Sequence, residues 1–403
     1  MKPRNIVFSA IICLLVFGPS ILYCVQKSQV VKLPTWLTVA DANVLAGVAN
    51  DVDLSSSATF ENFRDGVFQE SLQKEIENYI PLKADILLRN ASIQRQFIKA
   101  SNSLFSWSWY PTYYGSTRMH SDKYGLIATP IVDKSSKISS NLKKTAKLYK
   151  DISEEYPDIK FILVNPDSAE SSFLMNGLRS NPYTRKMFQN DFFERLGSKI
   201  TIVKAWAKSI EEQHENYFIT DHHRTIDGGY DLYTKISSEL GLGDDIVDKG
   251  KPYYFSVDFL GSQGRAGLDD SLGFEVIKDY DFDLRDCKVY VDDVEQTFDA
   301  IDSREKYSSD NFKTSRFANQ YAYYFHNDVG KIQIEAAEQK GSGDLLIFGD
   351  SFTNNMERLF INNFDNVFSY NCKKNRSVIR AKLNEHENVK AVVIIQSFNN
   401  IID

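Results

Sequence analysis

The stretch Gly343–Asn355, GDLLIFGDSFTNN, predicts a buried strand, a tight turn and the start of a helix. The apolar run from Leu345 to Phe348 has no polar interruption, which is typical of strands buried inside a parallel sheet. Gly349 permits a sharp turn, so Ser351 would lie between the carboxyl end of the strand and the amino end of the helix. Because open α/β sheets bind ligands at this edge, we expect an α/β fold with a site at Ser351.

Segments elsewhere in the chain fit the same architecture. Two apolar runs, at 159–164 and 389–395, predict further buried strands, and the Lys-rich stretch 136–155 predicts an amphipathic helix. The stretch 245–325 holds short runs of β-forming residues and few helical patterns, which indicates a β-rich insert. We therefore expect one α/β domain over 61–403, in which helices flank a parallel sheet and the insert interrupts the chain.

The first 27 residues predict where the protein resides. Lys2 and Arg4 precede the uncharged run 5–25, which is 21 residues long, and a helix of about 20 apolar residues can cross a membrane. The run lacks the small-residue cleavage site of a secretory signal peptide. We therefore expect residues 1–27 to be an uncleaved, single-pass signal anchor in the cell membrane, followed by a linker at 28–60 and a domain outside the cytoplasm.

Composition narrows the classes of function. The 403 residues carry a net charge of −7, and no long basic run follows residue 30, so nucleic acid is not an expected partner. Cys13 and Cys24 lie in the apolar N-terminal run, and Cys287 and Cys372 lie in the rest of the chain. Because the chain has no Cys-x-x-Cys motif, a thiolate zinc site is not expected. The sequence is compatible with two alternatives: Cys287 and Cys372 form a disulfide, or each is an isolated thiol.

The stretch Asp221–Thr225, DHHRT, contains two of the six histidines. An aspartate two residues before a histidine can orient the imidazole and stabilise its protonated form. Asp221 and His223 would then serve as orienting group and base for a nucleophilic Ser351. A metal site would need more ligands than this stretch supplies, and a plain polar turn is the alternative without chemistry.

Taken together, the two motifs resemble those of the SGNH hydrolase superfamily. Most members place the serine block first and an Asp-x-x-His block last, whereas here the order is reversed and the spacer is one residue. Both departures are similar to the alginate O-acetyltransferase-like branch and its relatives with an Asp-His-His-Trp (DHHW) motif. That branch has an N-terminal membrane anchor, then Asp-x-His-Trp-Thr and then Gly-Asp-Ser-Phe. Here Arg224 stands in the place of the Trp.

The resemblance implies an SGNH-like, flavodoxin-like sheet with Ser351 as nucleophile, His223 as base and Asp221 as its orienting partner. The backbone N–H of Ser351 would help to form the oxyanion hole. Further candidates for oxyanion or substrate contacts are Gly349, Asp350, Asn354, Asn355, Asn399, His222 and Arg224. Neither a metal nor a cofactor is expected.

The implied activity is acyl-ester chemistry on a cell-surface or secreted polysaccharide. Ser351 would take an acetyl group and pass it to a sugar hydroxyl, as an O-acetyltransferase does, or to water, as an esterase does. By the same resemblance, a multi-pass membrane acyltransferase would be the partner that exports acetyl groups. The alternative is an inactive SGNH-like surface protein that binds or helps to assemble a glycan, and the replacement of Trp by Arg224 favours it.

Overall fold

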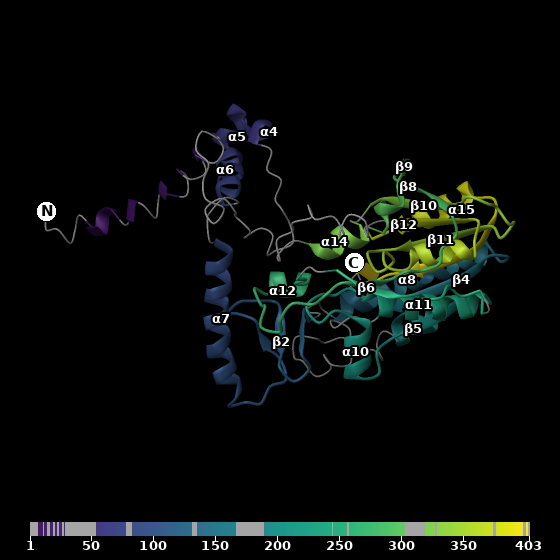
Figure 1. The fold of residues 1–403 in the computed structure, drawn as a ribbon, viewed down its shortest axis with the longest axis horizontal. Coiled ribbons are helices and arrows are strands. Elements are labelled where there is room, and N and C mark those ends of the chain that lie inside the picture. Colours follow the sequence, from purple (N-terminus) through teal and green to yellow (C-terminus); the bar gives the residue numbers. More distant parts are fainter. Residues whose placement is uncertain are drawn as a thin grey trace.

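The structure is a computed structural model of the 403-residue chain. It describes residues 7–10, 12–13, 17–18, 21, 24–25, 28, 54–77, 83–130, 135–166, 189–243, 245–255, 258–302, 319–326, 329–373, 376–397 and 400–401. A large sheet covered by helices forms the main body (Figure 1). At the edge of this body, α7 lies beside a smaller sheet.

The central sheet has eight strands in the order β5-β4-β13-β11-β12-β10-β8-β9. Neighbours from β5 to β12 are parallel, and the pairs beyond β12 are antiparallel. The parallel strands are β4 Lys160–Pro166, β5 Ile200–Ala205, β11 Asp344–Gly349, β12 Asn366–Asn371 and β13 Val389–Ile395. The antiparallel strands are β8 Cys287–Val291, β9 Val294–Gln296 and β10 Lys331–Ala336. The strands predicted at 159–164 and 389–395 are thus confirmed as β4 and β13.

The expected parallel sheet is confirmed from β5 to β12, whereas the strand pairs on the β10 side are antiparallel. β8 and β9, which come from the stretch predicted to be a β-rich insert, form a hairpin that continues the central sheet. Its turn holds Asp292 at φ 48° and Asp293 at φ 68°, and left-handed angles at both positions are typical of a two-residue hairpin, which joins antiparallel strands only. The same stretch also contains β6 Pro252–Tyr254, α12 Ser262–Ala266 and β7 Lys278–Tyr280, of which β6 and β7 form a separate sheet.

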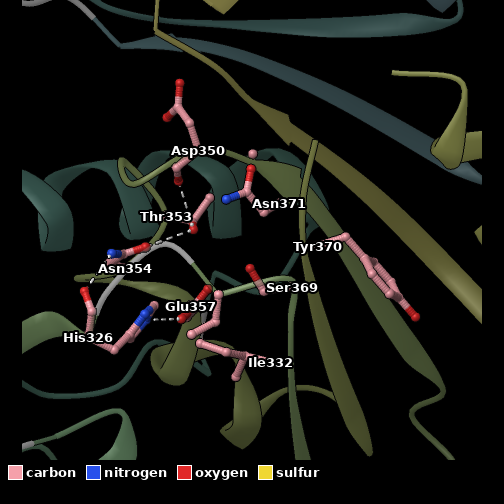
Figure 2. A pocket seen from close by; sticks show the side chains of 11 residues that line it. His326, Ile332, Asp350, Thr353, Asn354, Glu357, Ser369, Tyr370 and Asn371 are labelled. Carbon is pink, nitrogen blue, oxygen red and sulfur yellow. Dashed lines mark hydrogen bonds and ion pairs between the residues drawn. The ribbon is translucent and has the colours of Figure 1, made fainter. Parts of the chain in front are cut away.

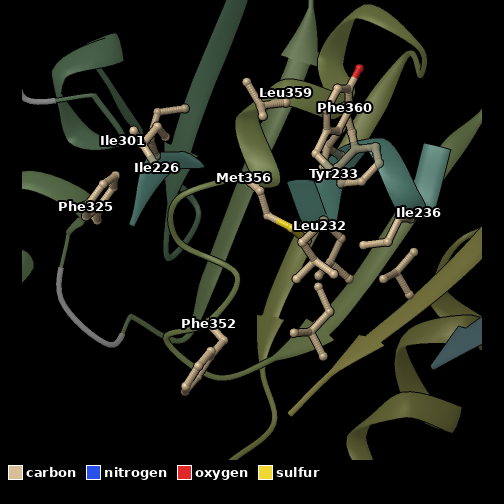
Figure 3. Packing of buried hydrophobic residues seen from close by; sticks show 14 of the residues in the cluster. Ile226, Leu232, Tyr233, Ile236, Ile301, Phe325, Phe352, Met356, Leu359 and Phe360 are labelled. Carbon is tan, nitrogen blue, oxygen red and sulfur yellow. The ribbon is translucent and has the colours of Figure 1, made fainter. Parts of the chain in front are cut away.

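Helices cover both faces of β11, which explains its uninterrupted apolar run. α8 (Ser135–Glu155) packs on the face toward which Leu346 and Phe348 point, and α11 (Ile226–Leu240) packs on the opposite face with Ile347. α8 confirms the helix predicted at 136–155. Figure 3 shows the α11 side of this packing, with Leu232, Tyr233 and Ile236 near Met356, Leu359 and Phe360.

The remaining described elements surround this core. They are α4 Leu54–Ser57, α5 Phe60–Arg64, α6 Val67–Glu77, α7 Lys83–Asn102, β1 Tyr110–Pro111, β2 Met119–Ser121, β3 Leu126–Ala128, η2 Phe193–Arg195, α10 Ile210–Asn216, η3 Phe298–Ala300, α14 Gln320–Phe325, η4 Glu357–Asn362 and α15 Val378–Glu385. Strands β1, β2 and β3 form the smaller antiparallel sheet beside α7. In the part of the chain that the structure describes, no helix has the length and hydropathy needed to cross a membrane. Much of 1–27 lies outside that part, and the anchor remains a prediction.

The two cysteines of the main body are free thiols in this structure. Cys287 starts β8 and is partly exposed, whereas Cys372 follows β12 and is buried. Burial raises the pKa of the Cys372 thiol to about 12. That thiol is therefore protonated and unreactive at neutral pH.

Candidate active site

Ser351 follows β11 in a turn that only glycine permits at its first position. A Cβ on Gly349 would lie 2.3 Å from Thr353 Cγ2 and 2.7 Å from the carbonyl oxygen of Ile395, far inside contact distance. Asp350 then holds the turn, since its Oδ1 accepts a hydrogen bond from Phe352 N at 3.1 Å. The sequence prediction of a strand and a tight turn before Ser351 is confirmed.

The C-terminal segment supports the turn from a second side. Asp350 Oδ2 accepts hydrogen bonds from the backbone N–H of Ser397 at 2.7 Å and from Asn400 Nδ2 at 2.6 Å. Its carboxylate therefore serves as an acceptor for three donors. A carboxylate with these contacts cannot donate to an oxyanion, so the interpretation of Asp350 as an oxyanion candidate is corrected.

The helix expected directly after Ser351 does not form. Turns follow the serine, and the next regular element is the 3₁₀ helix η4. Thr353 and its neighbours Asn354 and Asn355 have polar side chains that compete for backbone groups, and Thr353 Oγ1 donates to the Asp350 carbonyl at 3.1 Å. The backbone N–H of Ser351 therefore does not lie at the amino terminus of a helix, and no helix dipole reinforces it as an oxyanion donor. Among the described residues, no acceptor occupies the backbone N–H of Ser351, which stays the predicted donor.

Asp221 and His223 lie in the loop between α10 and α11. Thr225 caps α11 by accepting a hydrogen bond from Gly228 N at 3.1 Å, which places the DHHRT loop immediately before the helix. Asp221 Oδ1 accepts hydrogen bonds from His223 N at 3.0 Å and from His223 Nδ1 at 2.6 Å. The spacing of one residue therefore lets a single carboxylate fix both the backbone and the ring of the histidine.

The other ring nitrogen of His223 faces the serine. His223 Nε2 lies 2.7 Å from Ser351 Oγ, although 128 residues separate the two in the chain. Because Nδ1 donates to the carboxylate of Asp221, Nε2 carries the lone pair that accepts from the serine hydroxyl. The structure thus joins all three predicted residues in one hydrogen-bond chain, which is an arrangement that can deprotonate the serine.

Asp221 is buried yet ionised. Burial raises its pKa, but the imidazoles of His223 and His222 and the Arg265 guanidinium outweigh this effect and hold the pKa well below its usual range. Ser262 contributes as well, because its backbone N–H donates to Asp221 Oδ2 at 2.5 Å. The negative charge needed to stabilise a protonated His223 is therefore present throughout the neutral pH range.

Glu275 supports the loop from behind and was not found from the sequence. Its carboxylate accepts hydrogen bonds from the backbone N–H groups of Ile219 at 2.8 Å and Thr220 at 2.9 Å. Burial raises the pKa of Glu275 to about 7, against the lowering effect of these donors. No local motif marks this residue, since it lies 55 residues after Thr220 and meets the loop only in the folded chain.

Two other predicted candidates are structural. Asn355 gives its amide N–H groups to the carbonyls of Arg224 and Thr225, at 3.1 and 2.9 Å, so it ties the two motifs together and has none left for an oxyanion. Arg224 is 1% exposed. Its guanidinium lies 4.7 Å from the Tyr217 ring centroid and donates to backbone carbonyls of Ala205 and Gly228. The interpretation of both as oxyanion or substrate contacts is therefore corrected.

His222 and Asn354 stay near the site. His222 Nδ1 lies 2.8 Å from Ser262 Oγ, and its side chain is 31% exposed. Asn354 donates to the His326 carbonyl at 3.4 Å and lines a small cavity beside the serine turn, together with Asp350 (Figure 2). Their roles remain predictions, and Asn399 lies outside the described residues.

A metal interpretation of the loop competes with the serine interpretation. Asp221, His222 and His223 each offer a ligand atom, and these atoms lie within 4.8 Å of one another. Both ring nitrogens of His223 are engaged by Asp221 and Ser351 in this structure. A metal ion bound through His223 would therefore have to displace one of these hydrogen bonds.

Comparison with known proteins bears on the fold. No protein-family model and no curated protein matches the sequence. A DHHW family protein from Eubacterium siraeum DSM 15702 matches with a TM-score of 0.50 and 15% identity, over 71% of this chain and 92% of that one. Bacillus cereus PatB1, solved with a sulfonyl adduct, matches with a TM-score of 0.50 and 18% identity, over 69% of this chain and 95% of that one.

The chain has the fold of these two proteins. The O-acetyltransferase domain of Pseudomonas putida AlgJ also matches, with 8% identity over 72% of this chain and 90% of that one, but its TM-score of 0.40 is too low to support an argument. The resemblance of the two sequence motifs to the SGNH-like DHHW branch is therefore confirmed at the level of the fold.

Proposed function

We propose that this protein is an SGNH-like serine acyl enzyme. The observation that supports the proposal best is the continuous hydrogen-bond chain from Asp221 through His223 to Ser351, with distances of 2.6 and 2.7 Å. Ser351 Oγ attacks the carbonyl carbon of an acetyl ester while His223 Nε2 accepts the hydroxyl proton. Asp221 stabilises the resulting imidazolium, and the Ser351 N–H donates to the developing oxyanion.

The reaction then passes through an acyl-enzyme. The bond between the carbonyl carbon and the leaving oxygen breaks, and His223 returns its proton to that oxygen. An acceptor hydroxyl next gives its proton to His223 and attacks the carbonyl carbon of the acetyl-serine. The bond between that carbon and Ser351 Oγ breaks, and His223 returns the proton to Oγ. A sugar hydroxyl as acceptor makes the enzyme an O-acetyltransferase, and water makes it an esterase.

The acceptor in this proposal is a polysaccharide outside the cytoplasm. Support comes from the resemblance of the two motifs to the alginate O-acetyltransferase-like branch and from the predicted anchor at 1–27. An enzyme anchored there receives acetyl groups from a multi-pass membrane acyltransferase. External protease added to intact cells without an outer barrier tests the location, since protection of the domain after residue 30 would contradict it.

The alternative of an inactive glycan-binding surface protein loses its main support. It rested on Arg224 in place of Trp, and the Arg224 side chain lies in the core on the ring of Tyr217. Residue 224 is not part of the hydrogen-bond chain from Asp221 through His223 to Ser351, so an Arg in place of Trp leaves that chain intact.

Covalent labelling tests the proposal. Phenylmethylsulfonyl fluoride should form an Oγ–S bond to Ser351 with loss of fluoride, and peptide mass spectrometry should locate the adduct. Hydrolysis of p-nitrophenyl acetate should disappear in Ser351→Ala, and acetyl transfer to oligosaccharides, measured against release of free acetate, separates transferase from esterase. Equal turnover by the wild-type protein and Ser351→Ala would reject the serine mechanism.

A further inference from the structure

One side chain that the proposed mechanism leaves unused contacts both ends of the His223–Ser351 hydrogen bond. Tyr321 on α14 lies with its ring parallel to the imidazole of His223, with centroids 3.8 Å apart and planes inclined by 8°. Its hydroxyl donates to the backbone carbonyl of Ser351 at 3.1 Å. Tyr321 is 3% exposed and lies 30 residues before the serine.

The short helix that carries Tyr321 is capped at its start, and at its end it contacts the segment that follows the serine turn. At its start, Asn319 Oδ1 accepts a hydrogen bond from Ala322 N at 3.4 Å. At its end, His326 adopts φ 64° and ψ 163°, a region that residues other than glycine occupy only when their surroundings enforce it. Its ring Nε2 lies 2.9 Å from Glu357 Oε1, inside the cavity wall (Figure 2).

Glu357 can bind His326 as an ionised carboxylate. Glu357 is 1% exposed. Burial raises its pKa, but the hydrogen bond and charge of His326 outweigh this effect and bring the pKa below its ordinary value. An ionised Glu357 binds His326 more strongly than a neutral acid would. The end of α14 is therefore held against the segment that follows the serine turn.

We propose that Tyr321 is a positioning residue for the base and the nucleophile, an inference that rests on the proposed serine chemistry. Its ring prevents the His223 imidazole from tilting out of the plane that joins Asp221 and Ser351. Its π face also attracts the positive charge that His223 gains when it accepts the serine proton. Its hydroxyl fixes the Ser351 carbonyl and with it the direction of Oγ.

Ordinary core packing is the competing explanation. The Tyr321 ring also lies 4.9 Å from the ring of Phe325 and 6.4 Å from that of Phe218, so its replacement will lower stability as well. The test must therefore separate the rate at each folded site from the fraction of protein that is folded.

Sulfonyl labelling of Ser351 supplies both quantities. The amplitude reports the folded fraction, and the rate constant reports how well His223 activates the serine. Tyr321→Leu should lower the rate constant by about 100-fold, as expected for a misplaced base. Tyr321→Phe keeps the ring and should stay within about fivefold of the wild-type protein, because it loses a single hydrogen bond.

A matched control comes from α11. Tyr233 is also buried, and its ring lies 5.0 Å from that of Phe360 in the same hydrophobic cluster (Figure 3). Tyr233→Leu should lower the labelling amplitude or the urea midpoint but leave the rate constant unchanged. In acetyl-ester turnover, Tyr321→Leu should lower kcat and leave KM unchanged, because positioning acts on the proton transfer.

The outcomes distinguish the inference from the proposed function. A wild-type rate constant in Tyr321→Leu, or an equal loss in Tyr233→Leu, overturns the positioning role while the serine mechanism stands. Absence of any adduct at Ser351 in the wild-type protein overturns the serine mechanism instead. If Tyr321→Leu fails to fold, Tyr321→Met fills the space with a flexible side chain and carries the same expectation.

Discussion

Two buried aspartate–histidine pairs in this protein have nearly the same geometry. His223 Nδ1 lies 2.6 Å from Asp221 Oδ1 at the carboxyl edge of the central sheet. His120 Nδ1 lies 2.7 Å from Asp269 Oδ2 beside the small sheet next to α7. The first pair is two residues apart in the chain, and the second is 149 residues apart.

The two pairs differ in the group that the second ring nitrogen of the histidine faces. His223 Nε2 faces the Ser351 hydroxyl at 2.7 Å, whereas His120 Nε2 lies 3.4 Å from the Asp122 carboxylate. A hydroxyl can give a proton to the histidine, whereas an ionised carboxylate has no proton to give. What the outer nitrogen faces thus decides whether an aspartate–histidine pair can act as a base in the proposed mechanism, and the pair at His120 lies in a structural ion network.

The strongest test of this contrast is removal of the proposed catalytic groups. Ser351→Ala, His223→Ala and Asp221→Ala should each lower kcat/KM for an acetyl ester by about 10³–10⁴-fold, and a double variant should lose no more than a single one. His120→Ala is the matched control and should keep its turnover per folded molecule. Additive losses would show that the three residues do not act as a unit.

The second test reverses the contrast. Asp269→Ala leaves the Arg95 guanidinium, which lies 3.1 Å from Asp269 Oδ1, buried without its counter-charge. We expect the free energy of unfolding to fall by about 4 kcal/mol and turnover per folded molecule to persist. Urea unfolding of this variant and of Ser351→Ala measures the difference. Equal stability of the two variants would contradict the structural role of the Asp269 pair.

The third test uses the ionisable group beside each aspartate, which is a guanidinium for Asp269 and a carboxyl group for Asp221. Arg95 stands beside Asp269, but Glu275, whose pKa is raised from 4.5 to about 7 by burial, stands behind Asp221. The folded state therefore binds more protons than the unfolded state between about pH 4.5 and pH 7, and the free energy of unfolding should fall by about 3 kcal/mol as the pH rises through this range. Urea midpoints at pH 5 and pH 8 should differ less in Glu275→Gln. Equal pH dependence in both proteins would refute this assignment.

The smallest effect is expected at the neighbour of the base. The His222 ring contacts Ser262 Oγ, whereas the His223 ring contacts Ser351 Oγ, so His222→Ala should lower turnover by less than about tenfold. EDTA should leave turnover unchanged, because no step of the serine mechanism needs a metal ion. Loss of activity with EDTA and recovery with zinc or manganese would favour the metal interpretation of Asp221, His222 and His223.

Local signals in the sequence predicted the elements that depend on near neighbours. The apolar run before Gly349 became β11, and the amphipathic pattern at 136–155 became α8. Gly241 ends the helix after DHHRT with φ 82°, a left-handed cap conformation that glycine favours. These features follow from periodicity, turn chemistry and capping, which a few consecutive residues determine.

Contacts between distant segments could not be predicted in the same way. Arg224 was expected near a substrate because of its place in the motif, but the fold turns it onto Tyr217. Glu275 and Tyr321 carry no motif, and both reach the site only because α14 and the stretch before β7 fold back onto it. Such contacts depend on which strands and helices become neighbours.

The sequence by itself determined the chemical groups and the local structure around them: an Asp-x-His loop before a capped helix and a serine in a glycine turn after a buried strand. Only the tertiary structure decided that this loop and this turn meet, with His223 Nε2 2.7 Å from Ser351 Oγ. Likewise, only the tertiary structure decided that the similar pair at His120 faces a carboxylate instead. The physical reason is that hydrogen-bond chemistry acts over about 3 Å. Local sequence fixes such distances within a turn, whereas across 128 residues the packing of whole elements fixes them.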